Sequence, residues 1–102
     1  MKNKLISSLG LAKKAGALSS GAPTVLEMIK KQKAAFVILA CDASENTAKM
    51  IKNSCSYYNV QFYVCDLSMQ ELSDGIGKKG LCAVVGIRKH DILNLILSVI
   101  KA

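Results

Sequence analysis

Apolar residues recur along this chain with two different spacings, one typical of helices and the other of strands. The segment from Lys4 to Ala15 has the helical spacing, with two lysines in its last turn and Gly16 as the residue that ends it. The segments from Pro23 to Gln32 and from Asp91 to Lys101 have the same spacing. Each of the three is predicted to be a helix that buries one stripe of its surface.

Two more helices are predicted from capping residues as well as from spacing. Asp42-Ala43-Ser44-Glu45 is a turn whose side chains can cap the helix that follows, in which one stripe is formed by Ala48, Ile51, Cys55 and Tyr58. Ser68-Met69-Gln70-Glu71 has the spacing of a capping box. It is predicted to open a short helix that ends near Asp74 or Gly75.

Three apolar segments are predicted to be strands, and Ala17 to Ser20 is a short connector or a fourth strand. The run from Ala34 to Cys41 is continuous, as in a strand covered on both faces, and is predicted to be the central strand. The run from Leu81 to Ile87 is also continuous. Val60 to Cys65 alternates, which indicates one better-buried face.

Helices and strands therefore alternate over 102 residues. This order predicts an α/β fold, a three-layer α/β/α sandwich with a mixed, mostly four-stranded sheet. We expect a single domain over residues 1–102, since no linker, repeat or low-complexity tract divides the chain.

The charge of the chain indicates a polyanionic partner. Fourteen Lys and Arg residues against seven acids give a net charge of +7. An acidic membrane surface and a nucleic acid both fit this charge, but the helices need their apolar stripes for the core, which favours nucleic acid. The longest apolar run, Ala34 to Cys41, is too short to span a bilayer, and no signal-peptide core is present, so we expect a cytoplasmic protein.

The cysteines and the single histidine give no support for a metal or cofactor site. The four cysteines form no close pair, and each lies in an apolar run, so they are predicted to be small buried residues in a reducing compartment. His90 lies between Lys89 and Asp91 at the start of the last helix and is predicted to be a surface or capping residue. We expect no catalysis, no metal and no cofactor.

The segment Ser19–Pro23 is predicted to be an anion-binding corner. Ser19, Ser20 and Gly21 are of residue types that are favoured in turns, and Pro23 fits the first turn of a helix. The unpaired N–H groups at that helix start, with the positive end of its dipole, favour phosphate. Lys30, Lys31 and Lys33 follow along the chain. The alternative is an ordinary turn followed by a solvated helix face.

A second loop, Gly75-Ile76-Gly77-Lys78-Lys79-Gly80, matches GxGxxG, but a helix precedes it and a strand follows, the reverse of a dinucleotide site. It is better interpreted as a glycine-rich loop whose lysines can approach a phosphate backbone, or as a helix end with a flexible turn. The loops Ser19–Pro23, Asp42–Asn46 and Asp74–Gly80 are candidates for one site if they lie at the same end of the sheet.

Several segments together resemble a known family. They are the Gly21 corner, Val37-Ile38-Leu39-Ala40 running into Asp42-Ala43-Ser44, Cys55-Ser56-Tyr57-Tyr58-Asn59-Val60, and Leu72-x-x-x-Ile76-Gly77-Lys78 before an apolar strand. In this order they resemble the ribosomal protein L-seven-Ae and L-thirty-e family of kink-turn RNA-binding proteins, most closely its small bacterial YlxQ-type members. The resemblance covers nearly the whole chain.

The resemblance implies that the corner and the second loop grip a sharply bent RNA. The family's Gly-x-Asn-Glu-x-x-Lys motif corresponds here to Gly21, Pro23, Thr24 and Glu27, of which only the glycine is retained. In the second loop Ile76, Gly77 and Lys78 keep the pattern, whereas Ser73 and Asp74 depart from it. The predicted RNA-binding residues are Ser20, Gly21, Ala22, Pro23, Thr24, Glu27, Lys30, Lys31, Asp42, Ile76, Gly77, Lys78 and Lys79.

The sequence therefore predicts a monomeric, non-catalytic protein that docks on structured RNA, either a kink-turn or ribosomal RNA, without a small-molecule substrate or a membrane. One alternative is a diverged ribosome-associated module that contacts proteins and binds RNA weakly and without specificity. A more remote alternative is a small nucleotide-binding enzyme.

Overall fold

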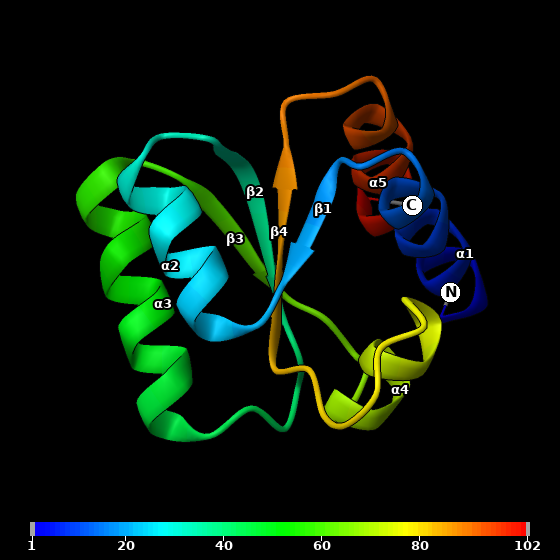
Figure 1. The fold of residues 1–102 in the computed structure, drawn as a ribbon, viewed down its shortest axis with the longest axis horizontal. Coiled ribbons are helices and arrows are strands. Elements are labelled where there is room, and N and C mark those ends of the chain that lie inside the picture. The colour runs from blue at the N-terminus through cyan, green and yellow to red at the C-terminus, as the bar shows by residue number, and fades with distance from the viewer. Residues whose placement is uncertain (1, 102) are drawn as a thin grey trace.

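A computed structural model describes residues 2–101 and shows a four-stranded sheet between two layers of helices (Figure 1). In chain order the elements are α1 (Lys2–Lys14), β1 (Leu18–Ser20), α2 (Ala22–Lys30), β2 (Ala34–Leu39), α3 (Glu45–Tyr58), β3 (Gln61–Val64), α4 (Met69–Gly75), β4 (Val84–Arg88) and α5 (Ile92–Lys101).

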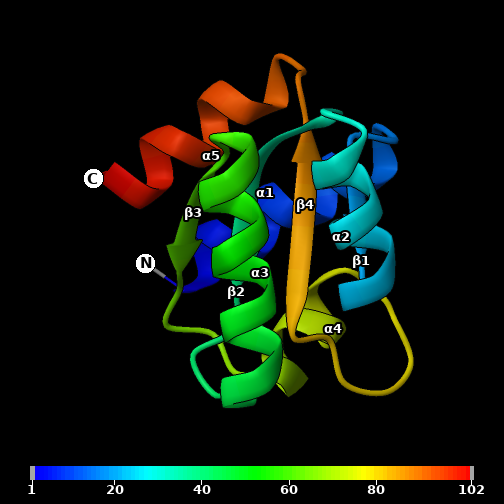
Figure 2. The ribbon, with the colours of Figure 1, turned by 90° about the vertical axis from the view of Figure 1, so that its left-hand side faces the viewer.

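The sheet is mixed, with the strand order β1-β4-β2-β3. Strand β4 is antiparallel to both of its neighbours, and β2 and β3 are parallel. Helices α2 and α3 cover one face, while α1, α4 and α5 lie on the other (Figures 1 and 2). The predicted three-layer α/β/α sandwich with a mixed four-stranded sheet is confirmed. Among the described residues, no helix is both long and apolar enough to cross a membrane.

Each face of the sheet has its own hydrophobic core. Phe36 and Ile38 of β2 face α1, α4 and α5, whereas Val37 and Leu39 face α2 and α3. Because consecutive residues of a strand point to opposite faces, both sets must be apolar when both faces are covered. This explains the continuous apolar run that predicted a central strand.

The helix ends follow the predicted capping chemistry. Gly16, with φ +72°, ends α1, and the Ala17 N–H bonds back to the Ala12 carbonyl at 2.9 Å. The Ser44 side chain accepts a hydrogen bond from the Thr47 N–H at the start of α3. Ser68 and Glu71 form the capping box that opens α4. His90 also caps, since its Nδ1 accepts from the Ile92 N–H at 3.1 Å.

Several predicted boundaries were wrong by a few residues. The last strand begins at Val84 rather than Leu81, because the segment before it bonds to α4 through the Cys82 N–H and the Met69 carbonyl, leaving Leu81 59% exposed. Helix α2 ends at Lys30, since the chain turns through Gln32 with φ +58°. Strand β2 ends at Leu39 instead of Cys41.

Three of the four cysteines are buried as predicted, but Cys41 is exposed. The prediction was wrong for Cys41 because β2 has already ended and the chain there turns toward α3 at the surface. Burial raises the pKa of the Cys55 thiol to about 11, and it also raises the pKa of Cys65.

Thiol reactivity tests this arrangement. We expect one thiol per folded chain, that of Cys41, to react promptly with a soluble thiol reagent at pH 8, because the other three are shielded. Unfolding in denaturant should release all four. Cys41→Ser should remove the prompt reaction. Two or more prompt equivalents in the folded protein would contradict the packing described.

Candidate functional site

The three loops that were candidates for one site, on the condition that they lie at the same end of the sheet, meet that condition. Strands β1, β2 and β3 run opposite to β4, so their carboxyl ends and the amino end of β4 meet at one rim. The loops Ser19–Pro23, Asp42–Asn46 and Asp74–Gly80 emerge there, at the lower end of Figure 1. We call the first of them the glycine corner, and the segment Gly77–Gly80 the lysine loop.

The glycine corner is held by the pairing of β1 with β4. The Gly21 N–H donates to the Val84 carbonyl at 3.0 Å, directly after the last ladder pair, Ser20 with Val85. Gly21 has φ +93° and ψ 142°, a combination that residues with side chains rarely adopt. It leads straight into α2, with Pro23 in the first helical turn.

The start of α2 carries the partial positive charge of its helix dipole, and no acidic side chain lies in its first turn. No side chain of the described residues caps it. The Val25 N–H bonds to the Gly21 carbonyl at 3.0 Å, while the amides of Ala22 and Thr24 belong to the orphan donors that begin every helix. Pro23 and Thr24 are exposed beside them. This end of α2 therefore presents donors and a partial positive charge at the surface.

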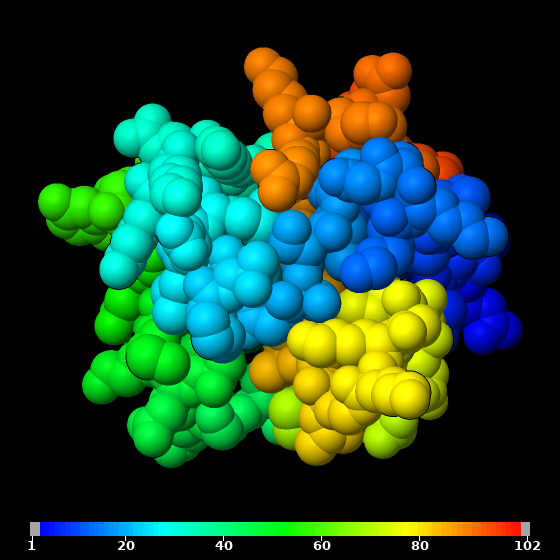
Figure 3. Space-filling view, in the orientation of Figure 1, coloured from blue at the N-terminus to red at the C-terminus, as the bar shows by residue number. Residues whose placement is uncertain are grey.

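The lysine loop lies directly against the glycine corner. A Cβ placed on Gly21 would stand 3.3 Å from the Nζ of Lys78. The loop is anchored by the Lys78 N–H, which bonds to the Ser73 carbonyl at 2.9 Å, and it turns through Gly77 at φ +70°. Figure 3 shows the two segments touching, although more than 50 residues separate them in the chain. Their contact was predicted only as a condition for a shared site.

Two predicted site residues have structural partners. The Asp42 carboxylate accepts a hydrogen bond from the Met69 N–H at 2.7 Å, which ties the loop after β2 to the start of α4. Ile76 is only 5% exposed and packs in the core with α1. Both residues therefore hold the rim in place, and a direct contact to RNA stays a prediction for each.

Lys30 and Lys31 are not brought to the glycine corner. They lie at the other end of α2, whose nine residues span about 13 Å. A shallow groove connects the two ends and is lined by Pro23, Leu26, Glu27, Lys30 and Lys31. The Nζ of Lys31 lies 2.9 Å from the Glu27 carboxylate, and this hydrogen bond and charge lower the pKa of Glu27. The negative charge of Glu27 is thus offset by the neighbouring Lys31.

The sequence reasoning missed a concentration of acids at the same rim. Five of the seven acidic residues lie there, in the loops after β2 and β3 and on α3 and α4: Asp42, Glu45, Asp66, Glu71 and Asp74. The signal was present, because capping positions favour acids and the helices that open at this rim were predicted from such residues. The lysine loop adds two positive charges to this rim.

Comparisons with known proteins identify the family of this chain. Residues 3–95 match the sequence model of the Ribosomal protein L7Ae/L30e/S12e/Gadd45 family. The chain belongs to this family. The resemblance stated from the sequence is therefore confirmed.

Two relatives carry the same name. The RNA-binding protein YlxQ of Enterococcus faecium is 39% identical over 77 residues, which are 76% of this chain and 74% of that protein. The RNA-binding protein YlxQ of Bacillus subtilis (strain 168) is 35% identical over 92 residues, 90% of each. Both relatives are thus of nearly the same length as this chain.

Solved structures share the fold. A protein of unknown function from Bacillus halodurans C superposes with a TM-score of 0.86 at 28% identity, over 96% of this chain and 97% of that one. The 15.5kD RNA binding protein of Giardia lamblia has a TM-score of 0.77 at 21% identity, over 97% of this chain and 83% of that one. At this identity the second likeness shows the fold alone.

Replacing Gly21 tests whether the corner depends on glycine backbone freedom. Gly21→Ala should lower the free energy of unfolding by about 1–3 kcal/mol, because the native φ is unfavourable for a side chain. Chemical denaturation measures this. Adding Lys78→Ala should not restore stability, since the flexible Lys78 side chain can move aside and the strain lies in the backbone. Unchanged stability of Gly21→Ala would contradict the corner's geometry.

Proposed function

We propose that this protein binds structured, kink-turn-like RNA through the glycine corner and the lysine loop, and that it does so without catalysis. The observation that carries the proposal is the contact between these two loops, with the Lys78 ammonium 3.3 Å from the Cβ position of Gly21. Membership of a family whose matched relatives are named RNA-binding proteins supports RNA as the partner.

The two loops offer complementary chemistry to a bent RNA backbone. The start of α2 supplies backbone N–H donors and the positive end of a helix dipole. Lys78 and Lys79 are exposed and supply full charges next to it. Gly21 has no side chain, so a phosphate or a base can approach the backbone closely.

The departures from the family motif shape the expected specificity. Pro23 and Thr24 stand where the motif has Asn and Glu, and Pro23 offers no amide to a base edge. Each lost base-edge pair costs on the order of 1–3 kcal/mol of discrimination. We therefore propose recognition led by the shape of the bend and by phosphate contacts, with a smaller preference for particular bases.

A gel-shift titration tests RNA recognition. The protein is titrated against a kink-turn RNA and against the same RNA with its sheared G·A pairs disrupted, each at several salt concentrations. We expect tighter binding of the intact kink-turn and affinity that falls with salt for both RNAs. Equal affinity at every salt would contradict kink recognition, and no binding at low salt would contradict RNA binding altogether.

The lysine loop is tested by Lys78→Ala with Lys79→Ala. We expect weaker kink-turn binding and a salt slope reduced by about two, because two phosphate contacts are lost. The melting temperature should not change, since both side chains are exposed. The matched control is Lys49→Ala with Lys52→Ala on α3, which removes the same charge from another face. Equal losses for both pairs would indicate a general charge effect instead of a site.

A further inference from the structure

The positive charge of this protein is concentrated at the end opposite the glycine corner. Half of its fourteen basic residues lie where α1 and α2 end and where β4 leads into α5. We call this surface the basic rim, and it consists of Lys13, Lys14, Lys30, Lys31, Lys33, Arg88 and Lys89. All seven are exposed.

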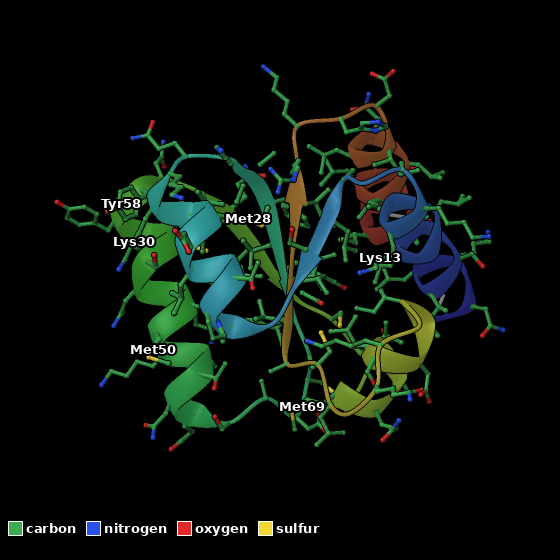
Figure 4. All side chains as sticks on the ribbon, in the orientation of Figure 1. Lys13, Met28, Lys30, Met50, Tyr58 and Met69 are labelled. Carbon is green, nitrogen blue, oxygen red and sulfur yellow. The ribbon has the colours of Figure 1, made fainter. Side chains whose placement is uncertain are left out.

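Strand pairing brings the turns of the basic rim together. Arg88 at the end of β4 pairs with Ala34 at the start of β2, next to Lys33. On its other side, the Arg88 N–H donates to the Ala17 carbonyl at 2.8 Å, in the turn that follows Lys14. Neighbouring strands are about 5 Å apart. The backbones of these three turns therefore lie within about 10 Å of one another. The flanking lysines extend the rim over both helix layers, as Lys13 and Lys30 show in Figure 4.

Few acids offset this charge. Glu27 and Asp91 are the acidic residues near the basic rim within the described part of the chain, and Glu27 is already paired with Lys31. The five acids of the opposite rim are separated from it by a molecule that measures 24 Å or more along each principal axis. Because the Debye length at physiological salt is about 8 Å, the two ends act as separate electrostatic surfaces.

The chemistry of the basic rim fits a phosphate backbone. Lysine and arginine are donors only, and they bind phosphate oxygens without reading base edges. The basic side chains come from three separate turns, so they form a broad surface instead of a pocket. Such a surface matches the regularly spaced charges of a double helix, and its binding releases condensed counterions.

We propose that the basic rim binds the phosphate backbone of a second RNA helix, so that this protein contacts RNA at both ends. The inference rests on RNA being the partner, as proposed above, but it does not require that the glycine corner recognises a kink. A protein with two such ends can hold two helical segments on opposite sides of one small body.

Charge reversal at the basic rim tests this proposal. The probe is an RNA duplex without a kink, and the variant is Lys33→Glu with Lys89→Glu. We expect at least tenfold weaker binding at low salt and a salt slope reduced by about two or more. The matched control, Lys49→Glu with Lys52→Glu, makes the same charge change on α3 and should cost less than threefold. Lys33→Arg with Lys89→Arg should bind like the wild type, and melting curves confirm that all variants fold.

A bridging assay separates this proposal from the previous one. Kink-turn RNA is immobilised, and capture of a labelled, unkinked duplex is measured with protein present. We expect capture by the wild type and loss of capture by Lys33→Glu with Lys89→Glu, while the kink-turn still retains that variant. The wild type could show no preference for the kinked RNA while the rim variant loses duplex binding. That pair of results would contradict the proposed kink recognition and leave the basic-rim proposal standing.

Two results would overturn the basic-rim proposal. One is an equal loss of duplex binding in the rim variant and in the α3 control, which would mean that net charge alone determines the binding. The other is wild-type duplex binding by the rim variant together with loss of its binding to an acidic polypeptide such as polyglutamate. That outcome would assign the basic rim to an acidic protein partner.

Discussion

The antiparallel pairing of β1 with β4 is the constraint on which the candidate site depends. It is short, three residue pairs followed by the hydrogen bond from the Gly21 N–H to the Val84 carbonyl. That bond fixes where the chain leaves the sheet, and therefore where α2 begins. Because β4 is reached through the loop after α4, the same pairing places the Lys78 side chain against Gly21. A small local ladder thus brings together two loops that lie far apart in the sequence.

The structure also separates two surfaces that a basic composition does not distinguish. The glycine corner offers backbone N–H donors, and a ligand could approach its backbone closely. The lysine loop adds positive charge beside it, among several acids. Those acids have their own tasks, since Asp42 and Glu71 accept hydrogen bonds at the start of α4. The excess positive charge lies at the other end of the sheet. Under the two proposals made above, the shape of the glycine corner would give specificity for RNA, and the charge of the basic rim would give affinity that depends strongly on salt.

Local signals in the sequence predicted most of the fold. The capping box at Ser68, the terminating Gly16 and the doubly buried β2 are each encoded by a few adjacent residues, and each is confirmed. Features that depend on distant packing were predicted less well. The late start of β4 results from contacts of its preceding segment with α4, and the exposure of Cys41 results from where β2 ends. The position of Lys30 and Lys31 away from Gly21 follows from the direction of α2, which a list of neighbouring lysines does not show.

The claim that the glycine corner and the lysine loop form one RNA site is tested most directly by backbone amide chemical shifts. The labelled protein is titrated with a kink-turn RNA, and shifts are followed residue by residue. The account predicts that the largest changes occur together at Gly21, Ala22, Thr24, Gly77 and Lys78, with one common binding curve. Changes at only one of the two loops, or at neither while RNA binds elsewhere, would contradict it.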